Sequence, residues 1–286
     1  SLDRRQRQMC IRDRYVGIGS GVWGAQLVGE KISIASQNSV AYANGVAYWM
    51  GTDKFYQYDG RTRTLPCDIR RYIFTDINAE QYTQVFGGSN EGFNEVWWFY
   101  CSANSSNIDR YVIYNYAENI WYYGNMARSA WLDSGLRDFP LAATYNSRLV
   151  NHEEGVDDNE TGTAAAISSF ITSAEFDLDD GHQFMLTSRM VPDVSFEGST
   201  ASNPVIDMTL FGLSFSGSGF NDPASESGVN TGAVTRTATS PVEVYTTQIH
   251  TRVRGRQMAM KIESSTTGVQ WQLGSPRIDV RPDGRR

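Results

Sequence analysis

The fold class of this chain is decided by the stretch EVWWFYCSANSSNIDRYVIYNYAENIWYYG, residues 95–124. It contains three short runs, 96–101, 110–116 and 120–123, which are rich in aromatic and β-branched residues and separated by polar turn residues. Runs of this kind, bounded by Asn, Ser and Asp, are typical of antiparallel strands. We therefore expect a β-meander here.

A second stretch, VAYANGVAYWMGTDKFYQYDGRTRTL at residues 40–65, repeats this pattern. Asn44-Gly45 between two apolar runs is a strong signal for a two-residue hairpin turn. A third, weaker unit covers residues 129–150, with Asn146-Ser147 as its turn. Meanders that recur about every 40 residues are typical of propeller blades, so the sequence predicts two or three blades within residues 15–160.

A helical insert is expected between the first two meanders, at residues 66–84. Pro66 suits the first turn of a helix, and Ile69, Tyr72 and Ile73 share one helical face. Asn78 with Gln81 three residues later predicts the N-cap of a second helix with a capping-box partner.

The second half of the chain changes character after the polar, acidic stretch 152–165, which predicts a linker or long loop. Alternating apolar and polar residues predict an antiparallel β-sandwich over residues 161–286. Residues 216–240, rich in Gly, Ser, Thr and Asn, predict a loop, and Gly255 predicts a bulge or turn because the alternation changes parity there. The alternating segments are 167–178, 183–196, 205–216, 242–254 and 256–263. The expected fold class is thus all-β, an incomplete β-propeller followed by a C-terminal sandwich.

Composition agrees with a globular chain. Of 286 residues, 40% are apolar and 20% charged, and the net charge is −7. No apolar run approaches the about 20 residues that a membrane helix needs, so no membrane span is expected. Three cysteines exclude a disulfide scaffold.

The first fourteen residues stand apart from the rest. Residues 4–14, RRQRQMCIRDR, resemble a translated sequencing adapter, so we expect residues 1–14 to be an artefact that replaces the true N-terminus. The alternative is a basic arm that binds nucleic acid. Without these residues the net charge is −10, and Cys67 and Cys101 remain.

Several motifs resemble catalytic or binding signatures, and each is incomplete. The Gly19–Gly24 segment, GSGVWG, matches the dinucleotide pattern, but that fold needs a preceding core strand and a following helix, so a Gly-rich loop is expected. His152-Glu153-Glu154 begins like a zinc-protease motif and lacks the second His.

The segment DLDDG at residues 177–181 resembles the opening of a calcium loop. Its Gly falls at position five and its twelfth position is Ser188, so a solvated turn is expected, with a weak cation site near Asp177–Asp180 as the open alternative. No two carboxylates are singled out as a glycosidase pair. We expect that the chain is not an enzyme, that it binds no cofactor and that it has no catalytic or metal-binding residues.

Charge is distributed unevenly along the chain. Residues 251–286 carry eight basic and three acidic side chains, a net charge of +5, whereas residues 15–250 carry 12 basic and 27 acidic side chains, a net charge of −15. Arg252 and Arg254 fall on one strand face with Arg256 beyond the bulge, and we nominate these three as protein–protein contacts. Arg277, Arg281, Arg285 and Arg286 continue the basic set.

Three interpretations of this basic set are open. It could be a nucleic-acid patch, a surface that docks onto an acidic protein, including the acidic half of a neighbouring copy, or a solvated surface with local ion pairs. The overall acidity of the chain favours the second over the first, because most of the molecule repels DNA.

The two meanders and the insert resemble the packaged-DNA stabilisation, or tail hub (nozzle), proteins of short-tailed bacteriophages, which are related to the tail tubular protein B group. The resemblance covers about residues 17–150 and 245–286. The strings that carry it are MGTDKFYQYDG (50–60), LPCDIRRYIFTDINAEQYTQVFGG (65–88), NEVWWFY (94–100), DRYVIYNYAENIWYYG (109–124), RVRGRQMAMKIESS (252–265) and WQLGSPRIDVRPDGRR (271–286).

What the resemblance implies is a propeller in a hexameric ring below the portal, which retains packaged DNA, lines its exit channel and is not an enzyme. The implied partners are copies of the chain, the portal or adaptor ring, tail fibre proteins and passing DNA, and the implied location is the virion tail, assembled in the host bacterial cytoplasm. This chain departs from the family by lacking N-terminal blades. The alternatives are a receptor-binding or glycan-degrading tail protein and a host kelch-like interaction module.

Overall fold

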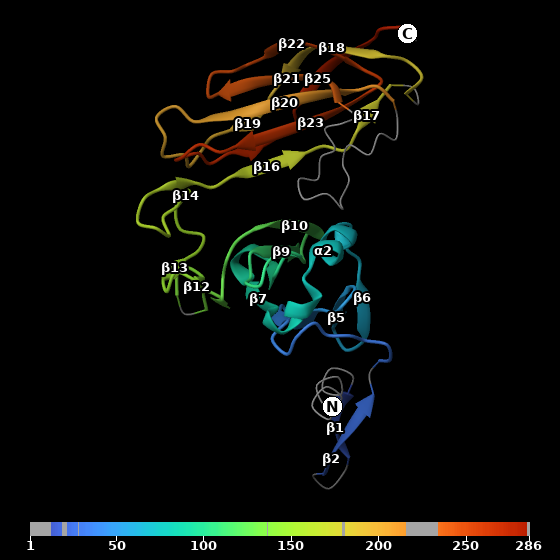
Figure 1. The fold of residues 1–286 in the computed structure, drawn as a ribbon, viewed down its shortest axis with the longest axis vertical. Coiled ribbons are helices and arrows are strands. Elements are labelled where there is room, and N and C mark those ends of the chain that lie inside the picture. Colours follow the sequence, from blue (N-terminus) through green and yellow to red (C-terminus); the bar gives the residue numbers. More distant parts are fainter. Residues whose placement is uncertain are drawn as a thin grey trace. The chain divides into compact units, whose positions relative to one another are not determined.

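The computed structural model describes residues 13–18, 22–27, 29–135, 137–178, 181–215 and 234–284 (Figure 1). Strands account for 48% of the chain and helices for 7%, which confirms the expected all-β class. The strands pair in antiparallel sheets. The chain divides into two compact units, Ser1–Glu154 and Gly155–Arg286, and the division falls inside the polar stretch 152–165.

The first unit begins with a hairpin of β1 (Asp13–Ile18) and β2 (Val22–Leu27). Strand β2 includes Val22 and Gly24, so the expected Gly-rich loop is wrong for this part of the GSGVWG segment, while residues 19–21 lie outside the described residues. A dinucleotide site requires a helix at this point of the motif, and the chain forms strand β2 there instead.

Two four-stranded meanders form the body of the first unit. The first sheet consists of β3 (Val40–Ala43), β4 (Val46–Met50), β5 (Phe55–Tyr58) and β6 (Thr62–Leu65), and the second of β7 (Phe86–Asn90), β8 (Glu95–Tyr100), β9 (Arg110–Asn115) and β10 (Ile120–Asn125). The predicted hairpin at Asn44-Gly45 is confirmed, because these residues join β3 to β4 with φ angles of 49° and 77°. Positive φ at both central positions is what a type I′ turn requires.

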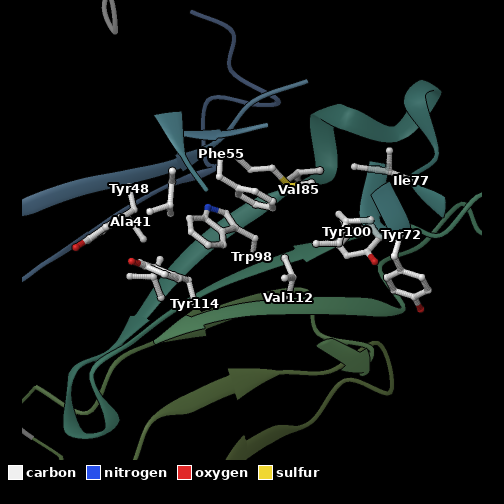
Figure 2. Packing of buried hydrophobic residues seen from close by; sticks show 14 of the residues in the cluster. Ala41, Tyr48, Phe55, Tyr72, Ile77, Val85, Trp98, Tyr100, Val112 and Tyr114 are labelled. Carbon is white, nitrogen blue, oxygen red and sulfur yellow. The ribbon is translucent and has the colours of Figure 1, made fainter. Parts of the chain in front are cut away.

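Both sheets contribute to one aromatic core (Figure 2). Trp98 on β8 is fully buried, its ring centroid lies 4.9 Å from that of Phe55 on β5, and its indole N–H donates to the Ser39 carbonyl over 2.9 Å. Tyr48 on β4 contacts Tyr114 on β9 at a centroid distance of 5.9 Å. The aromatic residues that repeat in the two meanders are therefore the residues that pack the sheets together.

The helical insert contains α2 (Arg70–Asp76) and the 3₁₀ helix η1 (Ala79–Gln84), and a further 3₁₀ turn, η2 (Glu91–Phe93), joins β7 to β8. Tyr72 and Ile73 are buried in the aromatic core, as their spacing predicts. Pro66 is the exception: it precedes the helix by several residues and does not occupy its first turn. The backbone turns once between Pro66 and Arg70 before helical bonding begins.

Asn78 caps η1, as predicted, by accepting a hydrogen bond from the Glu80 N–H over 3.0 Å. The capping box is not formed with Gln81, whose side chain accepts instead from the Gln84 amide at 2.5 Å. The difference follows from helix type, because η1 is a 3₁₀ helix, wound more tightly than the α-helix for which the box geometry holds.

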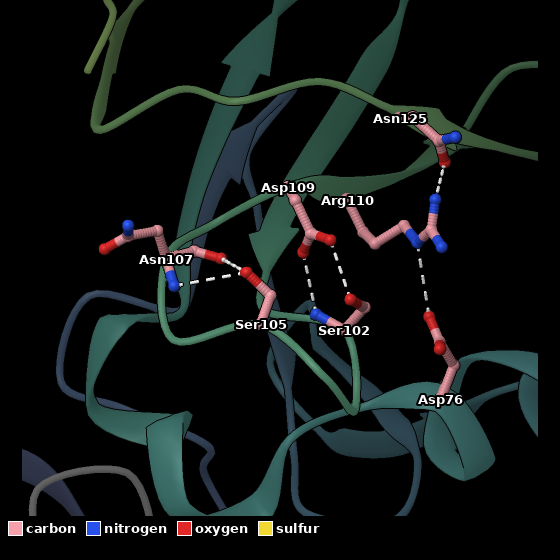
Figure 3. A network of polar contacts seen from close by, with 7 residues as sticks. All are labelled: Asp76, Ser102, Ser105, Asn107, Asp109, Arg110 and Asn125. Carbon is pink, nitrogen blue, oxygen red and sulfur yellow. Dashed lines mark hydrogen bonds and ion pairs between the residues drawn. The ribbon is translucent and has the colours of Figure 1, made fainter.

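A polar network ties the insert to the second sheet (Figure 3). The Arg110 side chain on β9 is buried, its Nε lies 3.4 Å from the Asp76 carboxylate at the end of α2, and its Nη1 donates to the Asn125 side chain on β10. Beside it, the Asp109 carboxylate accepts from the Ser102 hydroxyl over 2.7 Å. These contacts thus link the end of α2 to β9 and β10 of the second sheet.

A third, smaller sheet is formed by β11 (Ala130–Leu132), β12 (Leu141–Ala143) and β13 (Leu149–Asn151). Trp131 stacks on Trp97 of the second sheet at a centroid distance of 4.9 Å and an interplanar angle of 17°. Ser147 has a φ of 59°, in agreement with the predicted turn.

The second unit contains two larger sheets that share one core rich in methionine. Met185, Met208, Val253 and Met258 in this core are fully buried. One sheet has the order β16 (Ser169–Thr172), β23 (Gln257–Ser264), β20 (Val205–Leu213), β21 (Val234–Glu243), with β17 (Phe176–Asp177) beside β23, and the other has the order β22 (Ile249–Gly255), β18 (Met185–Val191), β25 (Arg277–Pro282). Two minor pairs are β14 (Asp157–Asp158) with β15 (Ala165–Ala166) and β19 (Val194–Ser195) with β24 (Gln272–Leu273).

The expected loop at 216–240 is wrong for its last part, because residues 234–240 belong to strand β21; residues 216–233 lie outside the described residues. Its Ser and Thr side chains lie on a strand whose apolar partner is β20, so composition alone hides the pairing. The irregularity predicted at Gly255 is present, since the chain leaves one sheet at Gly255 and enters the other at Gln257.

Among the described residues, every helix is too short and too polar to cross a membrane.

Candidate functional site

The most distinctive surface of the molecule is the exposed face of the sheet β22–β18–β25. Along β22, Ile249 and Val253 are buried in the core, whereas Arg252 between them is exposed. Strand β25 alternates in the same way, and β18 does so on either side of a register shift between Thr187 and Arg189. Because side chains alternate between faces along a strand, the face away from the core carries five arginines. These are Arg189 on β18, Arg252 and Arg254 on β22, and Arg277 and Arg281 on β25. We call this set the basic face.

The strand register fixes the layout of the basic face. Arg254 and Arg281 both pair with Leu186 of the central strand, from opposite sides. Since neighbouring strands lie about 4.8 Å apart, the Cα atoms of these two arginines are about 10 Å apart. Arg189 lies in another row, between His250 and Asp279. The guanidinium groups are therefore spread over the whole sheet.

Two members of the basic face are held in place by carboxylates. Arg254 Nε lies 2.5 Å from Asp283 Oδ2, and its guanidinium sits 3.9 Å from the centroid of the Phe184 ring. Arg189 Nη2 lies 2.7 Å from Asp279 Oδ2. These contacts fix the geometry of part of the face, and at such exposed positions each adds little to stability.

Arg256, the third nominated residue, lies where the chain changes sheets. Its guanidinium is 4.7 Å from the Phe184 centroid, and Nη1 donates to the carbonyl of His182 over 3.2 Å. The structure therefore brings Arg254 and Arg256 together around one phenylalanine, and Arg252 stands apart as an exposed member of the face.

The composition of this face suits anion recognition. Arginine stays charged at all physiological pH values and matches carboxylates and phosphates with paired N–H groups. Five guanidiniums are accompanied by two carboxylates, Asp279 and Asp283, so the surface has an excess of positive charge. Such a surface suits the docking of an acidic partner.

Sequence reasoning missed Arg189 as a member of this face. Arg189 is remote in sequence from Arg252 and joins it only through the pairing of β18 with β22. Arg189 could have been assigned to this face from the alternation of side chains along β18, in which Met185, Thr187 and Met190 face inward. That alternation is interrupted by a register shift between Thr187 and Arg189, which hides the parity.

Residues of the two other motifs make local side-chain contacts. His152 Nε2 accepts a hydrogen bond from Arg128 Nε over 2.9 Å, and its ring lies 4.8 Å from the Trp131 ring. Asp177 accepts from the Gln257 side chain over 3.0 Å, while Asp179 and Asp180 lie outside the described residues. In the part of the chain that the structure describes, no three His, Cys, Asp or Glu side chains converge to hold a metal ion.

The structure also brings together two carboxylates that the sequence could not single out. The side-chain amide of the buried Asn90 lies 3.5 Å from Glu95 Oε2 and 3.3 Å from Glu153 Oε1. Trp97 donates its indole N–H to the same Glu95 oxygen over 3.0 Å. Burial raises the pKa of Glu95, and the neighbouring Glu153 raises it further. Burial likewise raises the pKa of Glu153.

No protein-family model matches the chain, and no curated protein matches it in sequence.

Proposed function

We propose that this protein is a structural component of the tail of a short-tailed bacteriophage, of the packaged-DNA stabilisation or tail hub class. In this role copies of the chain form a ring below the portal, which retains packaged DNA and lines its exit channel. The proposal rests on the resemblance of residues 17–150 and 245–286 and on the physical features below.

The observation that carries the proposal is the basic face on an otherwise acidic chain. Residues 15–250 have a net charge of −15, so each copy offers both a basic surface and an acidic surface to its neighbours. Opposite charges speed association and fix its register, which favours contacts between copies of one chain. An acidic channel wall would also repel phosphates and let DNA slide.

The fold of the first unit supports the same proposal. Two successive four-stranded meanders packed through an aromatic core, with a third sheet on the far side of the second, are what consecutive blades of an incomplete propeller would look like. Leu132 and Leu149 on the third sheet are 59% and 71% exposed. Apolar side chains in this position favour coverage by further protein. We interpret the second unit, with its two sheets around one core, as a β-sandwich.

A second candidate, a receptor-binding or glycan-degrading tail protein, has one observation in its favour. Glu95 and Glu153 share Asn90 as a hydrogen-bond donor beside Trp97, and a glycosidase needs two carboxylates near a sugar-binding surface. Release of reducing sugar from host polysaccharide, abolished by Glu95→Gln, would favour this candidate over the structural role.

The experiment that tests the structural role measures the mass and symmetry of the purified chain. Light scattering and negative-stain microscopy at 50 and 500 mM NaCl are expected to show closed rings that dissociate at high salt, because screening shortens the reach of surface charges. The variant with Arg252, Arg277 and Arg281 changed to Gln is expected to stay monomeric at low salt.

A matched control changes three exposed arginines of the first unit to Gln, namely Arg61, Arg70 and Arg71. It alters the net charge by the same amount and should leave the rings intact. Rings that persist in the basic-face variant would remove this face from assembly, and a monomeric wild-type chain at every salt concentration would contradict the proposal as a whole.

A further inference from the structure

A short acidic hairpin lies near the start of the second unit. It consists of β14, β15 and the turn between them, residues 157–166, and it carries Asp157, Asp158 and Glu160. Apart from Glu160, residues 158–165 are exposed. The sequence contains no Lys or Arg from residue 149 to residue 188, a stretch with nine acidic residues. This acidic hairpin therefore presents carboxylates to solvent without basic neighbours in the sequence.

Hydrogen bonds hold two of these carboxylates in place. Asp157 Oδ1 accepts from the Gly268 N–H over 2.7 Å, and Asp158 Oδ1 accepts from the Glu160 N–H over 2.8 Å. Within the described part of the chain, neither aspartate forms an ion pair. Each therefore has a second carboxylate oxygen that can accept from a cationic partner.

Three arginines of the basic face are the complement of this hairpin. Arg252, Arg277 and Arg281 are exposed, and among the described residues they form no ion pair. The other two members of the face already have carboxylate partners. The uncompensated guanidiniums thus match the carboxylates of the hairpin in number and are opposite to them in charge.

The two surfaces lie on opposite sides of the second unit (Figure 1). The basic face points away from the core that the two larger sheets share, whereas the hairpin leads into β16, the edge strand of the other sheet. They therefore do not meet within one molecule. A surface and its complement at different places on one subunit give head-to-tail contacts, which build a ring when the rotation between copies closes.

Apolar side chains beside the hairpin favour a protein as the partner. Ile167, Phe170 and Ile171 follow it directly and are 54%, 47% and 49% exposed. Among the described strands, β16 pairs only with β23, so one edge of β16 is open. Exposed apolar groups next to charged ones are typical of a protein–protein contact.

We propose that the acidic hairpin of one copy docks on the basic face of the next. The inference rests on the proposed function and names the segment that the basic face binds. The hairpin carboxylates accept N–H groups from Arg252, Arg277 and Arg281, in the paired geometry that guanidinium and carboxylate groups favour. Exposed ion pairs stabilise weakly one by one, so the assembly depends on ring closure, in which every copy makes both contacts.

Two variants test the docking. The neutral-face variant combines Arg252→Gln, Arg277→Gln and Arg281→Gln. The neutral-hairpin variant combines Asp157→Asn, Asp158→Asn and Glu160→Gln, which keeps the side-chain oxygens that accept from the backbone. Each variant, with an unchanged circular dichroism spectrum, should be monomeric in sedimentation velocity at 50 mM NaCl.

Mixed in equal amounts, the two variants should form a complex of two chains and nothing larger. One intact hairpin then meets one intact basic face, and the two remaining surfaces are neutral. The dissociation constant of this complex should rise by about tenfold or more from 50 to 500 mM NaCl, because salt screens exposed charges. The control combines Glu197→Gln, Asp207→Asn and Glu243→Gln, at exposed positions of the same unit, and should assemble as the wild type does.

The outcomes separate this inference from the proposed function. Wild-type rings that persist in the neutral-hairpin variant, or no complex in the mixture, would overturn the docking of the hairpin and leave the structural role standing. A neutral-face variant that loses binding to duplex DNA but still forms rings would assign the face to nucleic acid instead. A wild-type chain that is monomeric at every salt concentration would contradict both proposals.

Discussion

Gly212 and Gly255 lie against each other where β20 passes the end of β22: a Cβ atom on Gly255 would come within 3.0 Å of the Gly212 Cα. Immediately beyond this contact the Arg256 N–H donates to the Leu213 carbonyl over 2.8 Å. The two glycines thus let the backbones approach at the point where the chain moves from one sheet of the second unit to the other.

Gly255→Ala is therefore expected to destabilise the second unit by about 1–3 kcal/mol, the usual cost of forcing extra volume into a packed site. The new Cβ would lie 2.6 Å from the Gln257 carbonyl oxygen and 2.8 Å from the Leu213 nitrogen, and backbone atoms cannot rotate away. Urea unfolding followed by circular dichroism measures the change. Gly92→Ala, where the added carbon would meet only Asn90 Oδ1 at 4.0 Å, is the control, and an equal effect of both substitutions would rule out the close approach as the cause.

The ion pair of Asp76 and Arg110 makes a prediction about the first unit. Arg110→Met should cost about 2–4 kcal/mol, because it leaves the Asp76 carboxylate in a partly buried site without its counter-charge. The double variant Asp76→Leu with Arg110→Met should be more stable than Arg110→Met alone. A double variant that is less stable would show that Asp76 is held by other groups.

The loss of stability caused by Arg110→Met should depend on pH. Burial raises the pKa of Asp76, and the positive charge of Arg110 lowers it. Removing Arg110 therefore raises the pKa further above its unfolded value, so the folded state binds the proton more tightly and stability falls as pH rises. The loss caused by Arg110→Met should be larger at pH 8 than at pH 5.

Glu95→Gln should stabilise the first unit at neutral pH by about 0.5 kcal/mol, a modest effect for a half-buried side chain. Burial, followed by the negative charge of Glu153, raises the pKa of Glu95 in the folded state, so the carboxylate opposes folding above its ordinary titration range. The wild type should lose stability from pH 5 to pH 8 more steeply than the variant, as measured by calorimetric melting. Parallel curves for the two proteins would contradict this account.

The thiols of Cys67 and Cys101 should react slowly. Burial raises the pKa of Cys67 to about 12 and that of Cys101 to about 11, so few thiolates exist at pH 8. Alkylation by iodoacetamide, followed by peptide mass spectrometry, should be at least about a hundredfold slower for both cysteines in the folded chain than in urea. Rapid native labelling of Cys101 would mean that the second sheet opens locally.

Sequence patterns located the elements whose side chains alternate or whose turns have a specific chemistry. The hairpin at Asn44-Gly45, the cap at Asn78 and the inward parity of Val253 and Met258 are local features and could be predicted. Strand β21 could not, because its Ser- and Thr-rich sequence becomes a strand only through pairing with β20.

Only part of the basic face could be predicted from the sequence, for a related reason. Arg252 and Arg254 share a strand, so their common face follows from parity, but Arg189 joins them through a pairing that spans sixty residues of chain and a register shift. The pair of Glu95 and Glu153 depends on Asn90 between them, which no spacing rule connects. Contacts between distant segments are a property of the folded topology and carry no local signal.

The distribution of indole rings gives the molecule a built-in optical reporter. Six of its seven tryptophans belong to the first unit, and Trp271 is the one in the second. The parallel rings of Trp97 and Trp131 are close enough for their electronic transitions to couple. Intrinsic emission and the near-ultraviolet dichroic spectrum will therefore record mainly the loosening of the stacked aromatic sheets, while the methionine-lined half contributes to tryptophan emission through Trp271.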